Sequence, residues 1–586
     1  MSMAPVSGKA FDASVLKGVL RFVRPYRNAF VFATVLTVLL GLLSTARPLL
    51  IRDAVDTAVG SSEPWEVHRI ILWIMGLLLV ESLFQWSFYR LTNRLGQWVI
   101  RDMRLALFGR IMRFKMGYFD KTPVGTLVTR TVSDVETIAD IFSEGLLVIF
   151  GDFFKIAVLL AALFWAFDPT LVVISLSVIP ILFVATRWFQ RSIKESFTDV
   201  RNQVAALNAF VQERITGMAL VHLFGREAAE SARFEAINAK HRDANIRSIW
   251  SFSLFLPIIE LLSAVSIGLA VWYGGYKAAA QAGVTVGDLT AMILFINMLY
   301  RPLRQLADRF NTLQMGMVAS ERVLKLIHAT DEVEQNGTYV GPLQGVVEFQ
   351  NVVFGYRPEE PVLKGFNLQI AEGETLAVVG PTGAGKSTLI GLLLGHYLPQ
   401  SGQVVIDGVP LESWDKLALR SQAALVMQDV FLFSGTVRDN VTLFEPMDDE
   451  RIWNAAEAMG LADFLRTLPG GLDFQVQERG STLSTGQRQL LSFLRAFLLD
   501  PPVLVLDEAT SNIDSETERW VQKATETLTK GRTSIVVAHR LATISHADRI
   551  AVIADGVLAE CGTHEELIAL DGRYATLVKS SFTGEH

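Results

Sequence analysis

The sequence has 586 residues, of which 50% are hydrophobic and only 19% are charged, and its formal net charge is −7. This length exceeds one ordinary domain, and the composition is more apolar than that of a typical soluble protein. The modest negative charge gives no support for a basic nucleic-acid-binding surface, so we expect no nucleic-acid partner. The single cysteine, Cys561, excludes an internal disulfide framework and fits a reducing compartment.

The apolar residues are concentrated in the first part of the chain. We expect a transmembrane domain over residues 1–325, a linker over 326–345 and a soluble domain over 346–586. The stretch 11–27 is basic and amphipathic, which predicts an interfacial helix rather than a cleavable signal.

Six stretches of the first domain are long and apolar enough to cross a bilayer, which takes about 20 residues. They are Phe30–Ile51, Ile70–Phe88, Ile138–Phe167, Leu171–Phe189, Trp250–Trp272 and Val286–Leu306. The links after the second and fourth spans are long, rich in Lys and Arg, and poor in Pro and Gly. The positive-inside rule therefore places these links, both termini and the soluble domain in the cytoplasm. Their composition predicts helical hairpins that continue the spans out of the membrane.

Two carboxylates lie inside predicted spans, Glu81 in the second and Glu260 in the fifth. A buried intramembrane carboxylate is a candidate functional site by default, so Glu260 is a candidate for lining a substrate path. The alternative is that each group caps a helix, reaches the interface or faces water without a specific role.

Residues 380–388, Gly-Pro-Thr-Gly-Ala-Gly-Lys-Ser-Thr, lie between a short apolar strand pattern and a helical pattern. They match the phosphate-binding loop G-x-x-x-x-G-K-[ST]. The glycines let backbone N–H groups turn toward phosphate oxygens, Lys386 reaches the β- and γ-phosphates, and the Ser387 hydroxyl binds Mg²⁺. The helix N-terminus adds positive potential. The residues expected to bind ATP here are Gly380, Thr382, Gly383, Ala384, Gly385, Lys386, Ser387 and Thr388.

Two further strand patterns end in polar residues. Four apolar residues, 503–506, precede Asp507, which can hold Mg²⁺, and Glu508, which can polarise the attacking water. The stretch 534–540 is a strand pattern that runs into His539, and beside the other motifs we expect this histidine to contact the γ-phosphate. Alone, each of these endings would be a strand capped by solvated or structural polar groups.

The motifs follow one another in the order found in ABC transporters, and nearly the whole chain resembles a bacterial ABC exporter half-transporter. The resemblance implies that Tyr356 stacks on adenine and that Gln428 contacts Mg²⁺ or water. Residues 478–480 match the loop that touches the membrane-domain hairpins, and 481–489 match the family signature. Ser511 and Asp514 lie in the match to a loop that communicates across the dimer.

This resemblance implies a fold class and a set of partners. The expected fold is an α-helical membrane domain of six spans with long cytoplasmic helical extensions, followed by an α/β P-loop ATPase domain with a helical subdomain. The chain would be a transport ATPase in the bacterial cytoplasmic membrane, with ATP and Mg²⁺ as cofactors. Its partners would be membrane lipid, a small hydrophobic substrate and a second ABC half-transporter, because two ATPase domains close around two ATP molecules.

The signature departs from the usual Leu-Ser-Gly-Gly-Gln because Thr485 replaces a glycine. Ser484, Gly486 and Gln487 keep the groups that would bind the partner's ATP, and Thr485 adds a β-branched side chain where glycine allows close approach and positive φ. Gln477 and residues 511–514 also differ from the commonest pattern. An altered signature beside an intact hydrolytic set resembles the catalytically competent half of a heterodimeric exporter, and we favour this over a homodimer.

The sequence does not identify the transported molecule. Export of hydrophobic or amphipathic small molecules, such as drugs, is the leading hypothesis, with a lipid flippase as the alternative. An ATP-gated channel or a regulatory subunit is a rival of another class, and the presence of Glu508 argues against it. A soluble DNA-repair ATPase shares the ATP-site motifs, but the predicted spans exclude it.

Overall fold

The computed structural model describes residues 12–60, 64–280, 282–507, 515–537 and 544–582. These fall into two compact units. We call Met1–Met112 with Val124–Ala329 the helical unit, and Arg113–Pro123 with Thr330–His586 the mixed unit. The tip of the first predicted hairpin thus belongs to the mixed unit rather than to the helices on either side of it.

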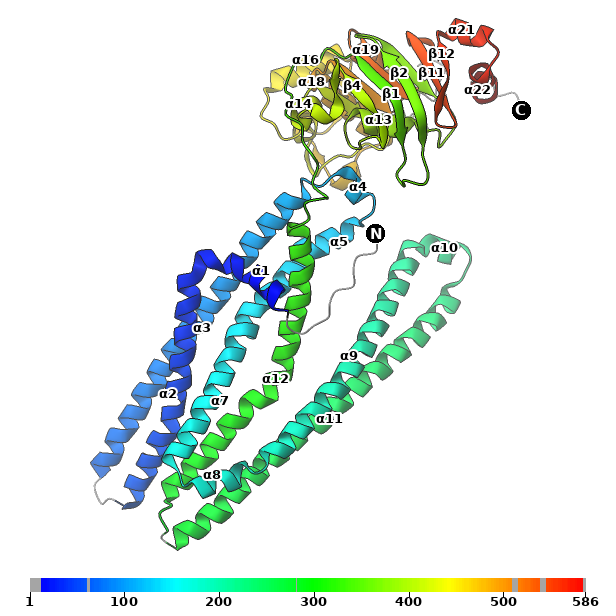
Figure 1. Ribbon diagram of the computed structural model, residues 1–586. Helices are drawn as coiled ribbons and strands as arrows, with labels where there is room; N and C mark the ends of the chain where they lie inside the picture. Colours follow the sequence, from blue (N-terminus) through cyan, green and yellow to red (C-terminus); the bar gives the residue numbers. More distant parts are fainter. Residues whose placement is uncertain (1–11, 61–63, 281, 508–514, 538–543, 583–586) are drawn as a thin grey trace. The chain divides into compact units, whose positions relative to one another are not determined.

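The helical unit consists of long helices with short interruptions (Figure 1). Its described helices are α1 (Ala13–Val23), η1 (Arg24–Tyr26), α2 (Arg27–Gly60), α3 (Pro64–Ile111), α5 (Val124–Thr129), η2 (Arg130–Asp134), α6 (Val135–Asp140), η3 (Ile141–Gly145), α7 (Leu146–Ala166), α8 (Pro169–Leu176), α9 (Ile179–Thr216), α10 (Met218–Leu223), α11 (Glu227–Ala279) and α12 (Val286–Ile327). The 53 residues of α11 exceed what a bilayer requires, which confirms helices that extend beyond the predicted spans.

Among the described residues, five helical stretches are long and apolar enough to cross a membrane. They are Ala13–Gly60, Trp65–Ile111, Leu146–Ala166, Pro169–Thr216 and Glu227–Ala279. The sixth predicted span lies at the start of α12, which is not among these five, and the polar side chains of Asp288, Asn297 and Arg301 interrupt its apolar run. The count of six spans therefore stays a prediction.

The third predicted span begins later than the sequence indicates. Residues 138–145, which we expected to be part of it, lie in α6 and in the π-helical turn η3. The α-helix starts only at Leu146, because Gly145 has φ −96° and ψ −96°, outside the helical region. Apolar composition does not reveal such a local break.

Aromatic packing holds α9 and α11 side by side. The rings of Phe189 and Phe255 stack with centroids 3.9 Å apart, and Phe252 meets Phe189 edge-on at 5.2 Å. Phe189 and Phe255 are both buried. Burial of these two large aromatic side chains in a stacked geometry stabilises the packing of α9 against α11.

The described residues of the mixed unit form three sheets. Its helices are α4 (Met116–Phe119), α13 (Lys386–Leu393), η4 (Leu411–Ser413), α14 (Lys416–Arg420), α15 (Val437–Thr442), α16 (Asp449–Ala458), α17 (Ala462–Thr467), η5 (Gly471–Asp473), η6 (Glu478–Gly480), α18 (Thr485–Leu499), α19 (Ser515–Thr529), α21 (His564–Ala569) and α22 (Arg573–Phe582). Its strands are β1 (Val347–Phe354), β2 (Leu363–Ile370), β3 (Thr375–Val379), β4 (Ser401–Ile406), β5 (Val409–Pro410), β6 (Ala423–Val426), β7 (Gly435–Thr436), β8 (Gln475–Val476), β9 (Val503–Asp507), β10 (Thr533–Val537), β11 (Arg549–Ala554) and β12 (Val557–Gly562).

The six-stranded sheet has the order β12-β11-β3-β10-β9-β6, and all of its pairs are parallel except β11 with β12. The antiparallel sheet β2-β1-β4-β5 forms a second layer. Strand β10 lies between β3 and β9, and Val537 pairs with Val378 on one side and with Asp507 on the other. Parallel strands end at the same edge, so the segments after β3 and β9 both start there.

Helix α18 provides one wall of the larger core. Leu490, Leu491 and Leu494 of this helix are fully buried beside Leu504 of β9. Leu499, at the end of the same helix, is 45% exposed. The helix therefore offers buried and exposed leucines for direct comparison.

Leu494→Ala should lower the melting temperature of the mixed unit by about 5 to 15 °C, because truncation of a buried leucine lowers the free energy of unfolding by about 2 to 5 kcal/mol. Thermal unfolding of the full-length protein, followed by tryptophan fluorescence, measures this shift. Leu499→Ala is the matched control and should shift the transition by no more than about 2 °C. Equal shifts for the two variants would contradict the burial described for α18.

Candidate functional site

The phosphate-binding loop predicted from the sequence connects β3 to α13. Gly385 precedes α13 with a left-handed φ of 108°, which glycine adopts without steric cost. A Cβ atom at Gly380 would lie 2.2 Å from the backbone oxygen of Ile553, so only glycine fits there. The pattern of glycines therefore has a steric cause in this fold.

Lys386 is the first residue of α13, and its side chain turns back over the loop. Its Nζ donates hydrogen bonds to the carbonyl oxygens of Gly380 at 2.6 Å and Pro381 at 3.1 Å. Burial lowers the pKa of the Lys386 ammonium group, and the charge of the nearby Asp507 opposes that shift. The loop, the lysine and Asp507 are thus brought together, as the sequence predicts.

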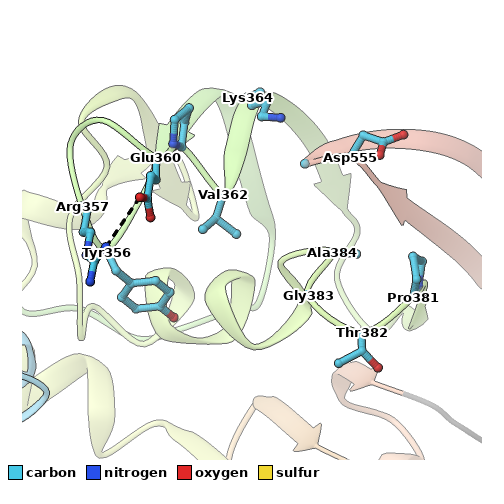
Figure 2. Close-up of a pocket in the computed structure, with 12 residues that line it drawn as sticks. Tyr356, Arg357, Glu360, Val362, Lys364, Pro381, Thr382, Gly383, Ala384 and Asp555 are labelled. Carbon is cyan, nitrogen blue, oxygen red and sulfur yellow. Dashed lines mark ion pairs between the residues drawn. The ribbon is translucent and has the colours of Figure 1, made fainter.

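Tyr356 lies across a cavity of about 470 Å³ from the loop residues Pro381–Ala384 (Figure 2). The residue is 46% exposed, and its hydroxyl lies 3.3 Å from Oγ1 of Thr388 on α13. Arg357 and Glu360 form an ion pair at 3.5 Å on the same rim. An exposed aromatic ring beside a phosphate-type loop suits a nucleotide whose base and phosphates occupy opposite ends of one cavity.

The remaining predicted groups are described in part. Gln428 follows β6 and is exposed, and Ser387 is exposed at the start of α13. Asp507 ends β9 at the sheet edge described above. Glu508, Ser511, Asp514 and His539 lie outside the described residues.

The available donors fit ATP and Mg²⁺. The loop supplies backbone N–H groups and the ammonium group of Lys386, and α13 begins at the same point. This combination suits a polyphosphate. Ser387, Gln428 and Asp507 offer a hydroxyl, an amide and a carboxylate oxygen, and Mg²⁺ prefers oxygen ligands with phosphate completing its shell. Among the residues that the structure describes, no cluster of three His, Cys, Asp or Glu could hold a metal by itself.

The signature residues start helix α18. Ser484 is its N-cap and forms a capping box with Gln487: the Gln487 backbone N–H donates to Ser484 Oγ at 3.2 Å, and the Ser484 N–H donates to Gln487 Oε1 at 2.9 Å. Thr485 is exposed, and its Oγ1 accepts a hydrogen bond from Arg488 at 3.1 Å. Thr485 is the first residue of the α-helix and has ordinary helical backbone, so the positive φ that a glycine would allow is not used here.

Arg495 ties the signature helix to the segment after Gln428. This half-buried guanidinium donates to the carbonyl oxygens of Asn440 at 2.9 Å and Phe431 at 3.5 Å. Burial lowers the pKa of Arg495, but an arginine stays charged at neutral pH. A movement of the loop at 428–431 is therefore coupled to α18 through one charged side chain, which the sequence reasoning did not single out.

A contact at the tip of the first predicted hairpin was not among the sequence predictions. Tyr397 donates a hydrogen bond to Asp120 Oδ2 at 2.7 Å, and its ring lies 5.3 Å from Tyr356, edge to face. Burial and the Asp120 carboxylate both raise the pKa of the Tyr397 hydroxyl, which keeps it protonated as the donor. The positions of the aromatic residues 354, 356 and 397 do not predict the contact with residue 120, because residue 120 is far away along the chain.

The two membrane carboxylates differ in their surroundings. Glu81 forms an ion pair with Arg47 at 3.7 Å. Glu260 has an exposed side chain on α11. A role for Glu260 in a substrate path stays a prediction.

Comparison with known proteins covers both units. The family description "ABC transporter transmembrane region" matches residues 30–303, and "ABC transporter" matches residues 363–511. The chain is 36% identical to a Bacillus subtilis protein named "Probable multidrug resistance ABC transporter ATP-binding/permease protein YheH", over 87% of this chain and 76% of the relative. It is 32% identical to an "ATP-dependent lipid A-core flippase" of Desulfotalea psychrophila, over 97% and 99%.

A solved structure agrees with these relatives. The chain superposes with a TM-score of 0.78 and 27% identity on a bacterial Atm1-family ABC exporter with ATP bound, covering 95% of this chain and 99% of the other. Membrane helices and ATPase domain are therefore matched together, over one continuous chain.

Lys386→Ala should remove the stabilisation that ATP gives the protein. At ATP concentrations about 100-fold above Kd, the unsubstituted protein should gain about 2.7 kcal/mol, and the variant should gain close to none. Melting temperature against ATP concentration measures the difference. Lys530→Ala, which removes an exposed lysine elsewhere in the mixed unit, should keep the full shift; a full shift in Lys386→Ala would contradict the site.

The hydrogen bond between Tyr397 and Asp120 should contribute about 1 kcal/mol of coupling energy. A double-mutant cycle with Tyr397→Phe and Asp120→Ala, measured by thermal unfolding, isolates this term. Tyr397→Phe keeps the ring beside Tyr356, so ATP affinity should stay within about twofold. Additive effects of the two substitutions would show that the contact carries no energy.

Proposed function

The chain belongs to the ABC transporter family and is a transport ATPase of the exporter type, and on this premise we propose that it exports hydrophobic or amphipathic small molecules across the cytoplasmic membrane. The observation that carries the proposal is a phosphate-binding loop beside an exposed aromatic ring, in one chain with apolar helices long enough to cross a bilayer. The chain is a multi-pass membrane protein, and we place its ATPase domain in the cytoplasm by the positive-inside rule.

Hydrolysis of ATP is assigned to the groups at the edge of the six-stranded sheet. Tyr356 stacks on adenine, and the loop with Lys386 holds the phosphates. Glu508, which directly follows Asp507 in sequence, accepts a proton from the attacking water as that water's oxygen bonds to the γ-phosphorus. The bond to the β,γ-bridging oxygen breaks and leaves ADP, while His539 donates a hydrogen bond to the γ-phosphoryl group. Ser387, Gln428 and Asp507 would hold Mg²⁺, which would supply neutralisation of the phosphate charge.

The signature residues serve a second half-transporter. ABC exporters of this kind act as two halves, because the signature of one half completes the ATP site of the other. Ser484, Gly486 and Gln487 would bind the partner's ATP, with Thr485 beside it and Ser511 and Asp514 communicating between the sites. The exposed end of α18, where Thr485 side chain and capping groups face outward, supports this role.

We favour a heterodimer over a homodimer. The altered signature and the retained Glu508 belong to this chain, whereas the partner in such a pair lacks the glutamate and has an ordinary signature. The native mass of the assembly purified through a tag on this chain decides the question. A second, distinct half-transporter in equal amount is expected, and a fully active assembly of two copies of this chain would contradict it.

A lipid flippase is the second proposal for the cargo. Relatives named as flippases and relatives named for multidrug export match this chain over similar lengths. Both functions predict ATPase stimulation in a membrane, and they differ in which ligand stimulates.

Glu508→Gln should lower steady-state ATP hydrolysis by at least about 100-fold, because it removes the group that accepts the proton, and should leave ATP bound. Phosphate release from the purified exporter in nanodiscs measures the rate, and retained nucleotide measures trapping. Glu565→Gln, an exposed glutamate on α21, should hydrolyse ATP at the unsubstituted rate. Undiminished hydrolysis in Glu508→Gln would contradict the assignment of Glu508 as the group that accepts the proton.

A further inference from the structure

A second cavity of the mixed unit, of about 710 Å³, shares Tyr356 and Arg357 with the cavity beside the phosphate-binding loop. We call it the linker cavity, because residues 330–335 of the predicted linker form part of its wall. The hairpin tip at 115–121 and the segment 395–398 also contribute to this wall. The volume lies within the range of about 300 to 1,000 Å³ that small-molecule sites occupy.

Backbone hydrogen bonds fix the wall of the linker cavity. The Lys115 N–H donates to the carbonyl oxygen of Glu332 at 2.8 Å, and the Glu334 N–H donates to that of Arg113 at 2.9 Å. The carboxylate of Glu334 also forms an ion pair with Arg420. The hairpin tip and the linker are therefore joined within the mixed unit, and their contact gives the cavity a stable shape.

Lys416 supplies a buried cation to the linker cavity. It is only 5% exposed, and its Nζ donates a hydrogen bond to the carbonyl oxygen of Leu411 at 3.0 Å. An ammonium group has three N–H donors, and the described residues offer Lys416 no second acceptor. A Cβ atom at Gly395 would lie 2.9 Å from this Nζ, so the glycine keeps the space beside it open. Buried donors without acceptors are costly, and a ligand that brings acceptors would remove this cost.

His396 lies next to this glycine in the chain and lines the same cavity. Its imidazole is half-buried and has no hydrogen bond to any residue in the described part of the chain. Burial lowers the pKa of His396, Arg420 lowers it further, and the carboxylates of Glu334 and Asp120 oppose the shift. A neutral imidazole keeps one N–H donor, so His396 offers a second donor beside that of Lys416.

Three aromatic rings form an apolar part of the wall. The ring centroids of Phe354, Tyr356 and Tyr397 lie 5.3 to 5.4 Å from one another, in tilted and edge-to-face arrangements. A planar aromatic ligand can extend such a group by stacking or by edge contact. The linker cavity thus combines an aromatic surface with hydrogen-bond donors.

Carboxylates also line the linker cavity, and two of them already have partners. Asp120 accepts a hydrogen bond from Tyr397 at 2.7 Å, and Glu334 is paired with Arg420. Asp331 is exposed. A cationic ligand could approach these groups, but it would leave the N–H donors of Lys416 without acceptors. The buried donors therefore favour an anion.

We propose that the linker cavity binds an aromatic carboxylate and that this binding increases the affinity of the chain for ATP. The carboxylate oxygens accept hydrogen bonds from Lys416 and His396, and the ring packs against Tyr356 and Tyr397. A ligand that restricts Tyr356 in advance lowers the entropy that ATP binding must remove. The binding itself depends on the mixed unit alone, whereas its effect on ATP rests on the proposed function, in which Tyr356 stacks on adenine.

The experiment compares three naphthalene probes of one size and different charge: 2-naphthoate, 2-naphthamide and 2-naphthylmethylammonium. Each is dialysed to equilibrium against the full-length protein, as it purifies from membranes, in phosphatidylcholine nanodiscs. Empty nanodiscs give the amount of probe that the lipid takes up. The Kd of 2-naphthoate should be about tenfold lower than that of the other two, the size of one charge-assisted hydrogen bond.

Substitutions on the wall of the linker cavity should act in opposite directions. Lys416→Met should raise the Kd of 2-naphthoate about tenfold, because it removes the buried charge. Since Lys416 is buried, two exposed positions test the site without disturbing the interior. Lys121→Gln should raise this Kd about twofold and Asp331→Asn should lower it about twofold, as expected for exposed charges. Lys530→Gln, at an exposed lysine outside the cavity, is the matched control and should leave it unchanged.

The effect on ATP is measured in Glu508→Gln, so that ATP is not consumed. Saturating 2-naphthoate should lower the Kd of ATP about threefold, and saturating ATP should lower the Kd of 2-naphthoate by the same factor, because coupling between two sites is reciprocal. Lys416→Met should lose this coupling. The melting temperature as a function of ATP concentration reports the first change, and dialysis reports the second.

The possible outcomes separate the site from the proposed function. No binding of 2-naphthoate, equal binding of all three probes, or binding that is unchanged in both Lys416→Met and Lys121→Gln overturns the site. Binding at the site with an unchanged Kd of ATP overturns its effect on ATP. If ATP does not bind in a Lys386-dependent way, the proposed function fails, whereas the dialysis result for 2-naphthoate is independent of it.

Discussion

The hydrogen bonding of β10 between β3 and β9 is the constraint on which the ATP site depends. Because Val537 pairs with Val378 on one side and Asp507 on the other, the phosphate-binding loop and the acidic strand end are held one strand apart at a common edge. Side chains alone could not fix this spacing, since loops without a shared sheet would move independently. This spacing brings the carboxylate of Asp507 close enough for its charge to act on the buried ammonium group of Lys386.

A second constraint links the ATP edge to the surface that a partner would use. The capping box of Ser484 and Gln487 fixes where α18 begins, and buried leucines fix its face against β9. Arg495, from the same helix, holds the backbone at Phe431 and Asn440. Arg495 therefore connects the backbone that follows Gln428 to the helix that begins at Thr485.

In the helical unit, charged side chains that lie inside apolar helices must be neutralised. Arg52 meets Asp288 at 2.9 Å and Lys277 meets Asp168 at 2.6 Å, so these pairs balance. The ion pairs of Arg47 with Glu81 at 3.7 Å and of Arg309 with Asp152 at 2.6 Å neutralise further charges between helices of this unit.

Much of the local structure at the candidate ATP site could be predicted from the sequence, because local patterns determine it. The glycines and Lys386 of the loop, the apolar strand before Asp507 and the capping residues of α18 each depend on neighbours a few positions away. The family order of these motifs then predicted the exporter fold. The break at Gly145, the helical backbone of Thr485 and the exact number of spans were outside the reach of such patterns, because small backbone rotations and scattered polar residues decide them.

Other features were decided only by tertiary structure. The hydrogen bond from Tyr397 to Asp120 joins residues 277 positions apart, and the ion pairs Arg47–Glu81 and Arg309–Asp152 each join two separate helices. No periodicity in the sequence brings these residues together, since their proximity follows from how separate helices and loops pack. The sequence by itself determined that this chain binds ATP and enters a membrane, while packing decided which charges meet inside it, because only packing sets distances between residues that are remote along the chain.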